Sequence, residues 1–186
     1  MSILVQIDPQ AYFFWALLLL LLPLKWLLAA FFSALVHEIS HIFVLKIQGG
    51  TIYRIHVHWN GCVIEADRGR HISAFCSILA GPLGSLSLLF LYRIAPQIAV
   101  CGLIQGVYNL IPLMPLDGGR LFCEILYRIC PERTPIIMQG IESVLRIGIV
   151  TGILIMMNAQ RMSLLPGLML VIWNIRAALR KIPCKP

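Results

Sequence analysis

Residues 26–45 read WLLAAFFSALVHEISHIFVL, and this stretch decides the fold. Two serines, two histidines and one glutamate interrupt an otherwise apolar run. The run is long enough to cross the hydrocarbon core of a bilayer, which takes about 20 residues. His37, Glu38 and His41 stand within it in the order H-E-x-x-H. Because ionisable groups are costly inside a membrane helix and usually serve a function there, the run predicts a transmembrane helix that carries a functional site.

The composition of the whole chain points to the same class of protein. Of its 186 residues, 59% are apolar and 12% are charged, and the mean hydropathy is +0.86. An ordinary soluble domain has about 25% charged residues. Since there are too few polar side chains to cover a surface in water, we predict an all-α integral membrane protein. Residues 1–186 would form a single polytopic domain in the lipid bilayer.

Five further apolar runs suggest about six transmembrane helices in all. They are Tyr12–Leu24, Ile72–Tyr92, Ile98–Leu116, Ile136–Met157 and Leu164–Leu179. A tight turn near Pro23–Lys25 would separate the first two helices. Residues 120–135 are polar and basic and are expected to form a loop. Glu142 and Arg146 are four residues apart in the fifth run, a spacing that allows an ion pair on a helix.

Residues 51–66 have a different pattern. Apolar and polar side chains alternate from Thr51 to Trp59, as in a half-exposed strand. Asn60-Gly61 is a strong signal for a two-residue hairpin turn. Cys62–Ala66 would form the return strand. We therefore predict a small β-hairpin at about residues 51–66, at the membrane surface.

The basic residues set the expected orientation. With six crossings, eleven Lys and Arg residues fall on one side and three on the other. Because cytoplasmic loops carry the excess of Lys and Arg, the hairpin and both termini are expected in the cytoplasm, at a bacterial cell membrane.

The net charge of +7 does not indicate a nucleic-acid partner. The basic residues lie between apolar runs, where they suit an anionic membrane surface. None of the six cysteines forms a C-x-x-C pair, so neither a disulfide framework nor a zinc ribbon is expected.

The H-E-x-x-H sequence has a direct chemical interpretation. On a helix, His37 and His41 lie one turn apart on the same face, where two imidazoles can bind one Zn²⁺. Glu38 lies beside them, where its carboxylate can take a proton from a zinc-bound water. The alternative is that these groups only pair with one another inside a helix bundle.

Asp117 is the candidate third ligand, because a catalytic zinc usually has three protein ligands and one open position. It follows Pro112 and Pro115, which break a helix, and precedes Gly118. Irregular backbone at membrane depth lines a cavity or packs against protein, so Asp117 is expected to face a cavity. Two crossings separate it from His41 and return it to the same side. Alternatively, Asp117 is only a residue at a helix end or turn.

Taken together, these motifs resemble those of the site-2 proteases, the zinc intramembrane metalloproteases. The resemblance covers most of the chain and includes His37-Glu38-x-x-His41, Ala80-Gly81-Pro82 and Asn109-x-x-Pro112-x-x-Pro115-x-Asp117. More narrowly, the motifs resemble those of the sporulation type, which processes a sigma-factor precursor. Enzymes of that type carry a regulatory CBS domain after the membrane core. Residues 1–186 contain no such domain, so either it is absent or it lies beyond this sequence.

The resemblance implies an enzyme that hydrolyses a peptide bond of a membrane-associated or transmembrane protein. His37, His41 and Asp117 would bind zinc, Glu38 would be the general base, and Asn109 would hold the substrate carbonyl. The hairpin would guide the substrate by adding a strand to its edge. The implied substrate contacts are Thr51, Ile52, Tyr53, Pro112 and Pro115.

The expected partners are a protein substrate, such as a transcription-factor precursor, and regulatory membrane proteins. Two other functions also place His and carboxylate groups in a helix bundle: a divalent-metal transporter and a non-catalytic membrane scaffold. No string of polar residues crosses the membrane, which argues against transport. Glu38 argues against a scaffold, which needs no general base beside two metal ligands.

Overall fold

The computed structural model describes residues 4–7, 9, 19–20, 23–58, 61–67 and 74–159. The chain divides into two compact units, Met1–Leu110 and Ile111–Pro186. The expected single domain stays a prediction. The first and sixth predicted crossings, Tyr12–Leu24 and Leu164–Leu179, lie almost entirely outside the described residues.

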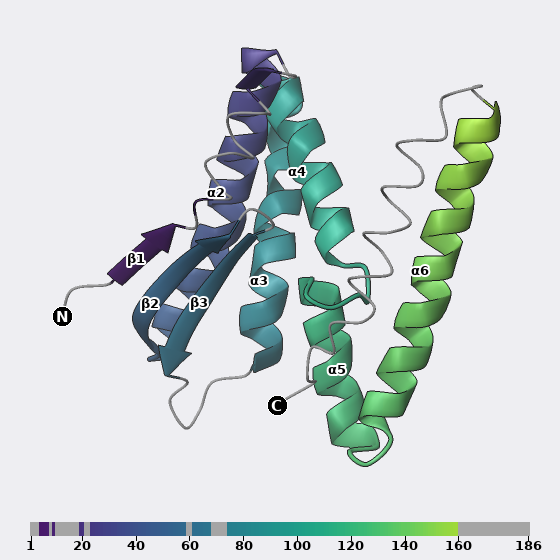
Figure 1. The fold of residues 1–186 in the computed structure, drawn as a ribbon. Helices are drawn as coiled ribbons and strands as arrows, with labels where there is room; N and C mark the ends of the chain where they lie inside the picture. Colours follow the sequence, from purple (N-terminus) through teal and green to yellow (C-terminus); the bar gives the residue numbers. More distant parts are fainter. Residues whose placement is uncertain are drawn as a thin grey trace. The chain divides into compact units, whose positions relative to one another are not determined.

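Three helices form the bundle of the first unit. They are α2 (Leu24–Ile47), α3 (Ala74–Ser87), which a 3₁₀ turn η1 (Leu88–Leu91) continues, and α4 (Pro96–Asn109). Each of the three packs against the other two, as Figure 1 shows. α2 begins directly after Pro23, whose carbonyl oxygen accepts from the amides of Trp26 and Leu27. The turn expected before this helix stays a prediction.

Small residues bring α3 and α4 close together. Ala99 is fully buried, and a Cβ added to Gly102 would come within 2.5 Å of the Ser85 carbonyl oxygen. A Cβ on Gly106 would come within 2.8 Å of Leu86 Cγ. Such close approach is typical of helix pairs in membranes, where packing rather than water exclusion drives association.

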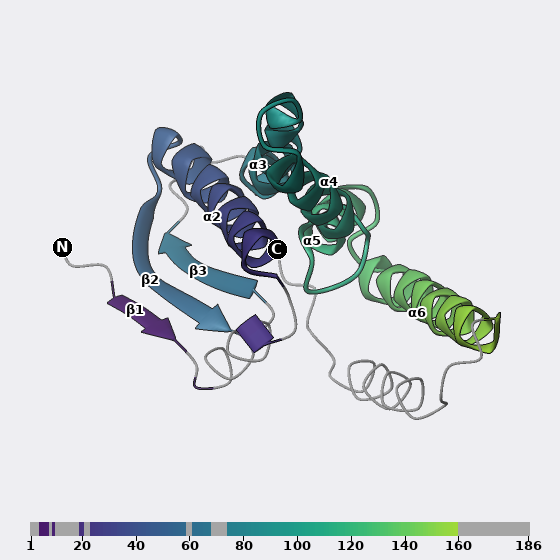
Figure 2. The same ribbon diagram turned by 90° about the horizontal axis from the view of Figure 1, so that it is seen from above.

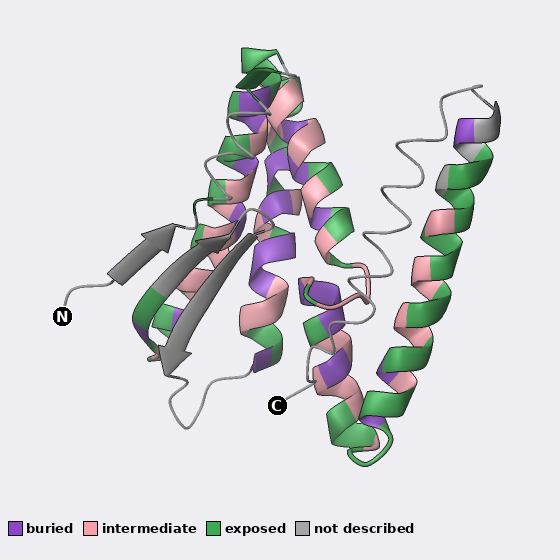
Figure 3. Cartoon of the chain, viewed as in Figure 1, coloured by how far each residue is buried: buried purple, intermediate pink, exposed green. Residues whose placement is uncertain are grey.

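α2 buries polar side chains and exposes many large apolar ones. Ser33 and His37 are buried, together with Leu27 and Leu45, whereas six other large apolar side chains are between 41% and 62% exposed. Those apolar side chains are Leu28, Phe31, Phe32, Leu35, Ile39 and Phe43. Figure 3 shows the alternation of buried and exposed positions along the helix. An apolar outer face with polar groups inside suits lipid as the surrounding solvent.

A three-stranded sheet belongs to the same unit. Its order is β1 (Leu4–Ile7), β2 (Thr51–His58) and β3 (Gly61–Asp67). β2 pairs antiparallel with β3 and parallel with β1, and an irregularity between Ile52 and Arg54 shifts the register. Figures 1 and 2 show β2 and β3 beside α2. Residues 59–60, which include the first position of the predicted Asn60-Gly61 turn, lie outside the described residues. The complete hairpin and its cytoplasmic placement therefore stay predictions.

The second unit contains α5 (Asp117–Ile129) and α6 (Thr134–Ala159), which contact each other. The expectation of a loop over residues 120–135 is wrong for most of this range. Polar residues recur every four positions along α5 at Arg120, Glu124 and Arg128, so this segment is an amphipathic helix. The many charged residues of this segment suggested a loop, but in the structure they share one face of α5. Glu124 pairs with Arg128 at 3.0 Å.

One cysteine also departs from expectation. Cys123 on α5 is disulfide-bonded. Cys76, Cys101 and Cys130 are free, as expected. Spacing along the chain carried no signal for this bond because it is not a local C-x-x-C pair.

Two helical stretches among the described residues are long and apolar enough to cross a membrane. They are Leu24–Ile47 and Ala74–Leu91. The predicted α-helical class therefore agrees with a mostly helical chain that carries candidate spans. The number of six crossings stays a prediction.

Replacing Gly102 by alanine should destabilise the bundle, because the new methyl group has no space beside Ser85 and Leu88. Overpacking of this kind costs about 1–3 kcal/mol. A thermal unfolding curve in detergent would measure it. Gly148→Ala is the control, since nothing lies within 4 Å of that added carbon. Equal midpoints for the two variants would contradict the close packing of α3 and α4.

Candidate metal centre

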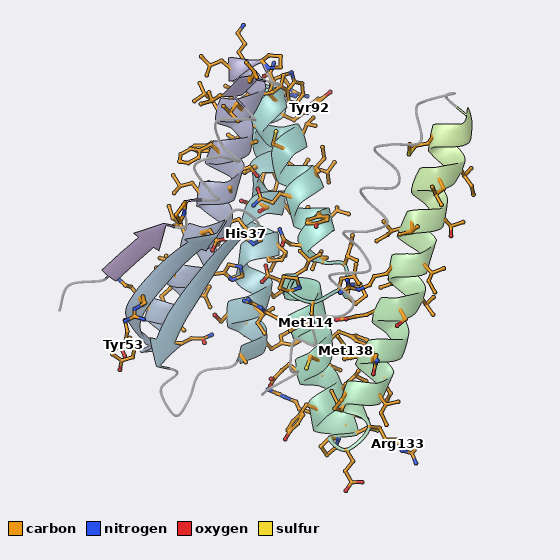
Figure 4. The ribbon with its side chains drawn as sticks, in the orientation of Figure 1. His37, Tyr53, Tyr92, Met114, Arg133 and Met138 are labelled. Atoms are coloured by element: carbon orange, nitrogen blue, oxygen red, sulfur yellow. The ribbon has the colours of Figure 1, made fainter. Side chains whose placement is uncertain are left out.

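His37 and His41 form the centre of the site within the first unit. Both lie on α2, and their Nε2 atoms are 3.2 Å apart. Their rings are nearly perpendicular, with an interplanar angle of 80°. His37 is only 4% exposed, and Figure 4 shows it midway along the helix. The spacing of four residues thus brings two ring nitrogens to one point, as the sequence predicted.

The second nitrogen of each ring is held by α3. His41 Nδ1 lies 2.7 Å from the carbonyl oxygen of Ser77, and His37 Nδ1 lies 2.9 Å from the buried Ser85 hydroxyl. A carbonyl oxygen only accepts, so His41 donates through Nδ1–H. In the neutral ring this leaves the lone pair on Nε2, the form that binds a metal. Such partners orient metal-binding histidines and fix their tautomers.

The glycines of α3 provide the space for these contacts. A Cβ on Gly81 would overlap His41 Nε2, and one on Gly84 would overlap the Ser40 hydroxyl. Gly81 belongs to the Ala80-Gly81-Pro82 motif, so its physical role is to admit the His41 ring. Any larger residue there would displace the ring.

The sequence analysis missed Ser77 and Ser85. The available signal was a matching period on the two helices, since small or polar residues recur at intervals of four, three and one. On α2 they are Ser33, His37, Ser40 and His41, and on α3 they are Ser77, Gly81, Gly84 and Ser85. Ser33 extends the polar face by donating to Gln105 Oε1 on α4 at 2.7 Å. Periodicity within one helix cannot show which face meets which.

Glu38 follows His37 on α2 and is half-buried. It is therefore the carboxylate adjacent in sequence to the two converging imidazoles. Its partial exposure lets it keep a charged carboxylate at lower cost than full burial would.

Asp117 belongs to the second unit, where it is the first residue of α5 and is 7% exposed. Its carboxylate lies at the positive end of the helix dipole, which favours the charged form. The preceding segment is irregular and contains a cis peptide bond between Met114 and Pro115. Gly118 and Gly119 are buried in the first turn of the helix.

Within the described residues, His37, His41 and Asp117 make up one group that could hold a metal ion. Two nitrogens bound to a tetrahedral zinc at about 2.0–2.1 Å are about 3.3–3.4 Å apart. The 3.2 Å separation of the two Nε2 atoms is close to that value. Two imidazoles and one carboxylate are a donor set that catalytic zinc sites use.

The other residues expected at the site are only partly accounted for. Asn109 ends α4, is half-buried and donates from Nδ2 to the Gln105 carbonyl oxygen at 3.1 Å. Pro112 is half-buried, and Pro115 is exposed. All three lie at or just after the end of α4, where the predicted break in the helix occurs.

The expected substrate contacts in the sheet differ in exposure. Thr51 and Tyr53 are exposed, and Thr51 Oγ1 donates to the Tyr53 hydroxyl at 3.1 Å. Ile52 is buried. β2 is the middle strand, and β1 pairs with its Arg54–Val57 stretch. The outer edges of the sheet therefore belong to β1 and β3.

No protein-family model matches the chain. Several individual proteins are nevertheless similar to it in sequence. A zinc metalloprotease of Methanocaldococcus jannaschii is 31% identical over 127 residues, covering 61% of this chain and 35% of that protein. A candidate zinc metalloprotease of Synechocystis is also 31% identical, covering 65% of this chain and 35% of the relative. Another candidate zinc metalloprotease, Rip3 of Mycobacterium tuberculosis, is 29% identical, covering 52% of this chain and 29% of that protein. The chain spans about a third of the length of these relatives.

A solved structure supports the same assignment at the level of the fold. The site-2 protease from Methanocaldococcus jannaschii matches with a TM-score of 0.66, over 100% of this chain and 95% of that one, at 22% identity. The chain resembles zinc metalloproteases of the site-2 protease type. The predicted resemblance is thereby confirmed, and zinc is supported both by the names of the relatives and by the donor set. The site-2 protease fold and the two apolar helices together support a membrane protein.

Removing the Ser85 hydroxyl should weaken zinc binding, because His37 would lose the hydrogen bond that orients its ring. Loss of such a partner costs about 10–100-fold in metal affinity. Competition with a chelating dye would measure the affinity of Ser85→Ala. Ser87→Ala is the control, since this exposed hydroxyl donates only to the Gly84 carbonyl among the bonds described. Equal affinities in both variants would show that Ser85 does not orient the ligand.

Proposed function

We propose that this chain is a zinc metalloprotease that hydrolyses a peptide bond of a membrane-associated or transmembrane protein. The observation that carries the proposal is the pair of Nε2 atoms 3.2 Å apart on α2, with Glu38 next in sequence to one of them. A metal-binding pair beside a carboxylate is what hydrolysis needs, whereas simple metal storage needs no adjacent base.

The proposed zinc ligands are His37, His41 and Asp117. Three protein ligands leave the fourth position of a tetrahedral zinc open for water or substrate. His37 and His41 are already oriented for this role by their bonds to α3. Asp117 is buried and begins α5 directly after the segment that contains Pro112 and Pro115.

When bound, zinc would lower the pKa of a water molecule and polarise the scissile carbonyl group. Glu38 would take the proton of the attacking water and pass it to the leaving amine. Asn109 would hold the carbonyl oxygen of the substrate. Its amide group has two N–H donors, and one of them already donates to the Gln105 carbonyl, which orients the group.

The substrate would bind as an extended strand, since an extended backbone exposes the peptide bond to attack. Addition to a sheet edge provides main-chain hydrogen bonds for this. Because β2 is the middle strand, β3 offers the longer outer edge. Thr51, Ile52 and Tyr53 lie at the start of β2, and Pro112 and Pro115 lie before Asp117. These five positions are proposed substrate contacts.

The setting is proposed to be a bacterial cell membrane, with several crossings and both termini in the cytoplasm. The cut would release part of a membrane-bound protein in a regulated way. A transcription-factor precursor, as in sporulation, is the proposed substrate class, and regulatory membrane proteins are proposed partners.

Zinc content provides the first test. Detergent-purified wild-type protein should hold about one zinc per chain, as expected for a three-ligand site. Asp117→Ala and His37→Ala should each lose most of it, because two remaining ligands bind zinc weakly. Elemental analysis after dialysis would measure the content. Wild-type protein that takes up no zinc, even from added metal, would contradict the proposal.

Glu38→Gln separates catalysis from metal binding. The variant should keep its zinc but cleave a transmembrane reporter about 10²–10⁴-fold more slowly, since an amide cannot accept the proton. Gel analysis of the reporter in detergent would measure the rate. Glu124→Gln, on α5 and paired with Arg128, is the control and should cleave normally. Full activity of Glu38→Gln would rule out the mechanism, and zinc flux into liposomes would favour a transporter.

A further inference from the structure

Glu142 and Arg146 form an ion pair in the middle of α6. Their closest oxygen and nitrogen are 3.6 Å apart, and their side chains are only 21% and 16% exposed. The helix around them is apolar. Partly buried charges in an apolar helix are costly and usually have a role beyond the helix that carries them.

The contact that Glu142 makes outside α6 is with the backbone of the segment at residues 110–116. The amide N–H of Met114 donates to Glu142 Oε1 at 3.0 Å, joining residues 28 positions apart in the chain. This segment has no regular secondary structure and leads directly into Asp117. Figure 4 labels Met114 beside α5. The carboxylate thus satisfies a backbone donor in the segment that carries the proposed third zinc ligand.

Gly119 supports the same segment from α5. A Cβ on Gly119 would lie 2.5 Å from the carbonyl carbon and oxygen of Leu113 and 2.7 Å from the nitrogen of Met114. The peptide between Leu113 and Met114 therefore packs directly on the first turn of α5. Leu116 N–H donates to the Leu113 oxygen at 2.8 Å and closes the turn. Asp117 is the residue directly after this turn.

We propose that Glu142, with Arg146 as its counter-ion, is a positioning residue for Asp117. It would hold the peptide at Met114 against Gly119 and so fix the direction in which α5 begins. The inference rests on the proposed function only in the role of Asp117 as a zinc ligand. A hydrogen bond to a charged acceptor is stronger than one to a neutral group, which suits a segment interrupted by prolines.

Three variants separate positioning from general stability. Glu142→Ala removes the acceptor, and Glu142→Gln keeps a carbonyl oxygen at the same place. Glu124→Ala is the matched control, because Glu124 also pairs with an arginine four residues on, at 3.0 Å, but lies on α5. Its only described partner is Arg128.

Zinc affinity of the full chain in detergent is the first readout. Glu142→Ala should bind zinc about tenfold more weakly, as expected when an outer support of a metal ligand is lost. Glu142→Gln should recover to within about threefold of wild type, because its amide oxygen can accept from Met114. Glu124→Ala should match wild type. Unchanged affinity in Glu142→Ala would overturn the inference, as would equal weakening in Glu124→Ala.

Hydrogen–deuterium exchange of metal-free protein is the second readout and needs no zinc. In Glu142→Ala the amides of residues 110–117 should exchange about tenfold faster, with little change in α4. The same rate as wild type would overturn the inference. If wild-type protein binds no zinc but the exchange effect is present, the proposed function fails, while the support of this segment by Glu142 stands.

Discussion

The two hydrogen bonds from α3 to His37 and His41 are the interactions on which the first unit depends. An imidazole buried in an apolar bundle has two ring nitrogens to satisfy, and lipid offers no water to do so. Ser85 and the Ser77 carbonyl each take one nitrogen. The remaining nitrogens, both Nε2, face each other at 3.2 Å. The requirement to satisfy polar groups thus also orients the two ring nitrogens that could bind a metal.

The same requirement explains the small residues of α3 and α4. The rings approach α3 only because Gly81 has no side chain, and α4 packs closely only because Gly102 and Gly106 have none. With large apolar residues outside and small or polar ones inside, the bundle has the reverse arrangement of a soluble domain. Packing density and hydrogen bonds, rather than exclusion of water, then hold the helices together.

In the second unit, an irregular segment packs on the first turn of α5 and is held by a side chain of α6. Pro112 and Pro115 end α4 and provide no backbone donors. Met114, between them, does have an N–H, and it donates to the Glu142 carboxylate. The cost of burying Glu142 is offset by Arg146 one turn later. An acidic side chain in an apolar helix is therefore explained by the backbone that it supports.

The sequence by itself determined the class of protein and the pair of imidazoles that could bind a metal. The H-E-x-x-H spacing places two imidazoles one turn apart on any helix, and the composition leaves too little polar surface for a protein in water. Local signals also located the ends of α2 and α4, because prolines act on the backbone directly. They failed over residues 120–135, where charges on one face of α5 resembled a loop.

Only the tertiary structure decided which groups complete the site. Ser77, Ser85, Gly81 and Glu142 act on residues far away in the chain, through faces that meet only after the helices pack. β2 likewise became the middle strand through pairing with β1, a segment that carried no sequence signal. Helical period shows which residues share a face but not which faces come together. That choice depends on shape and on the hydrogen bonds between helices, which are properties of the packed chain.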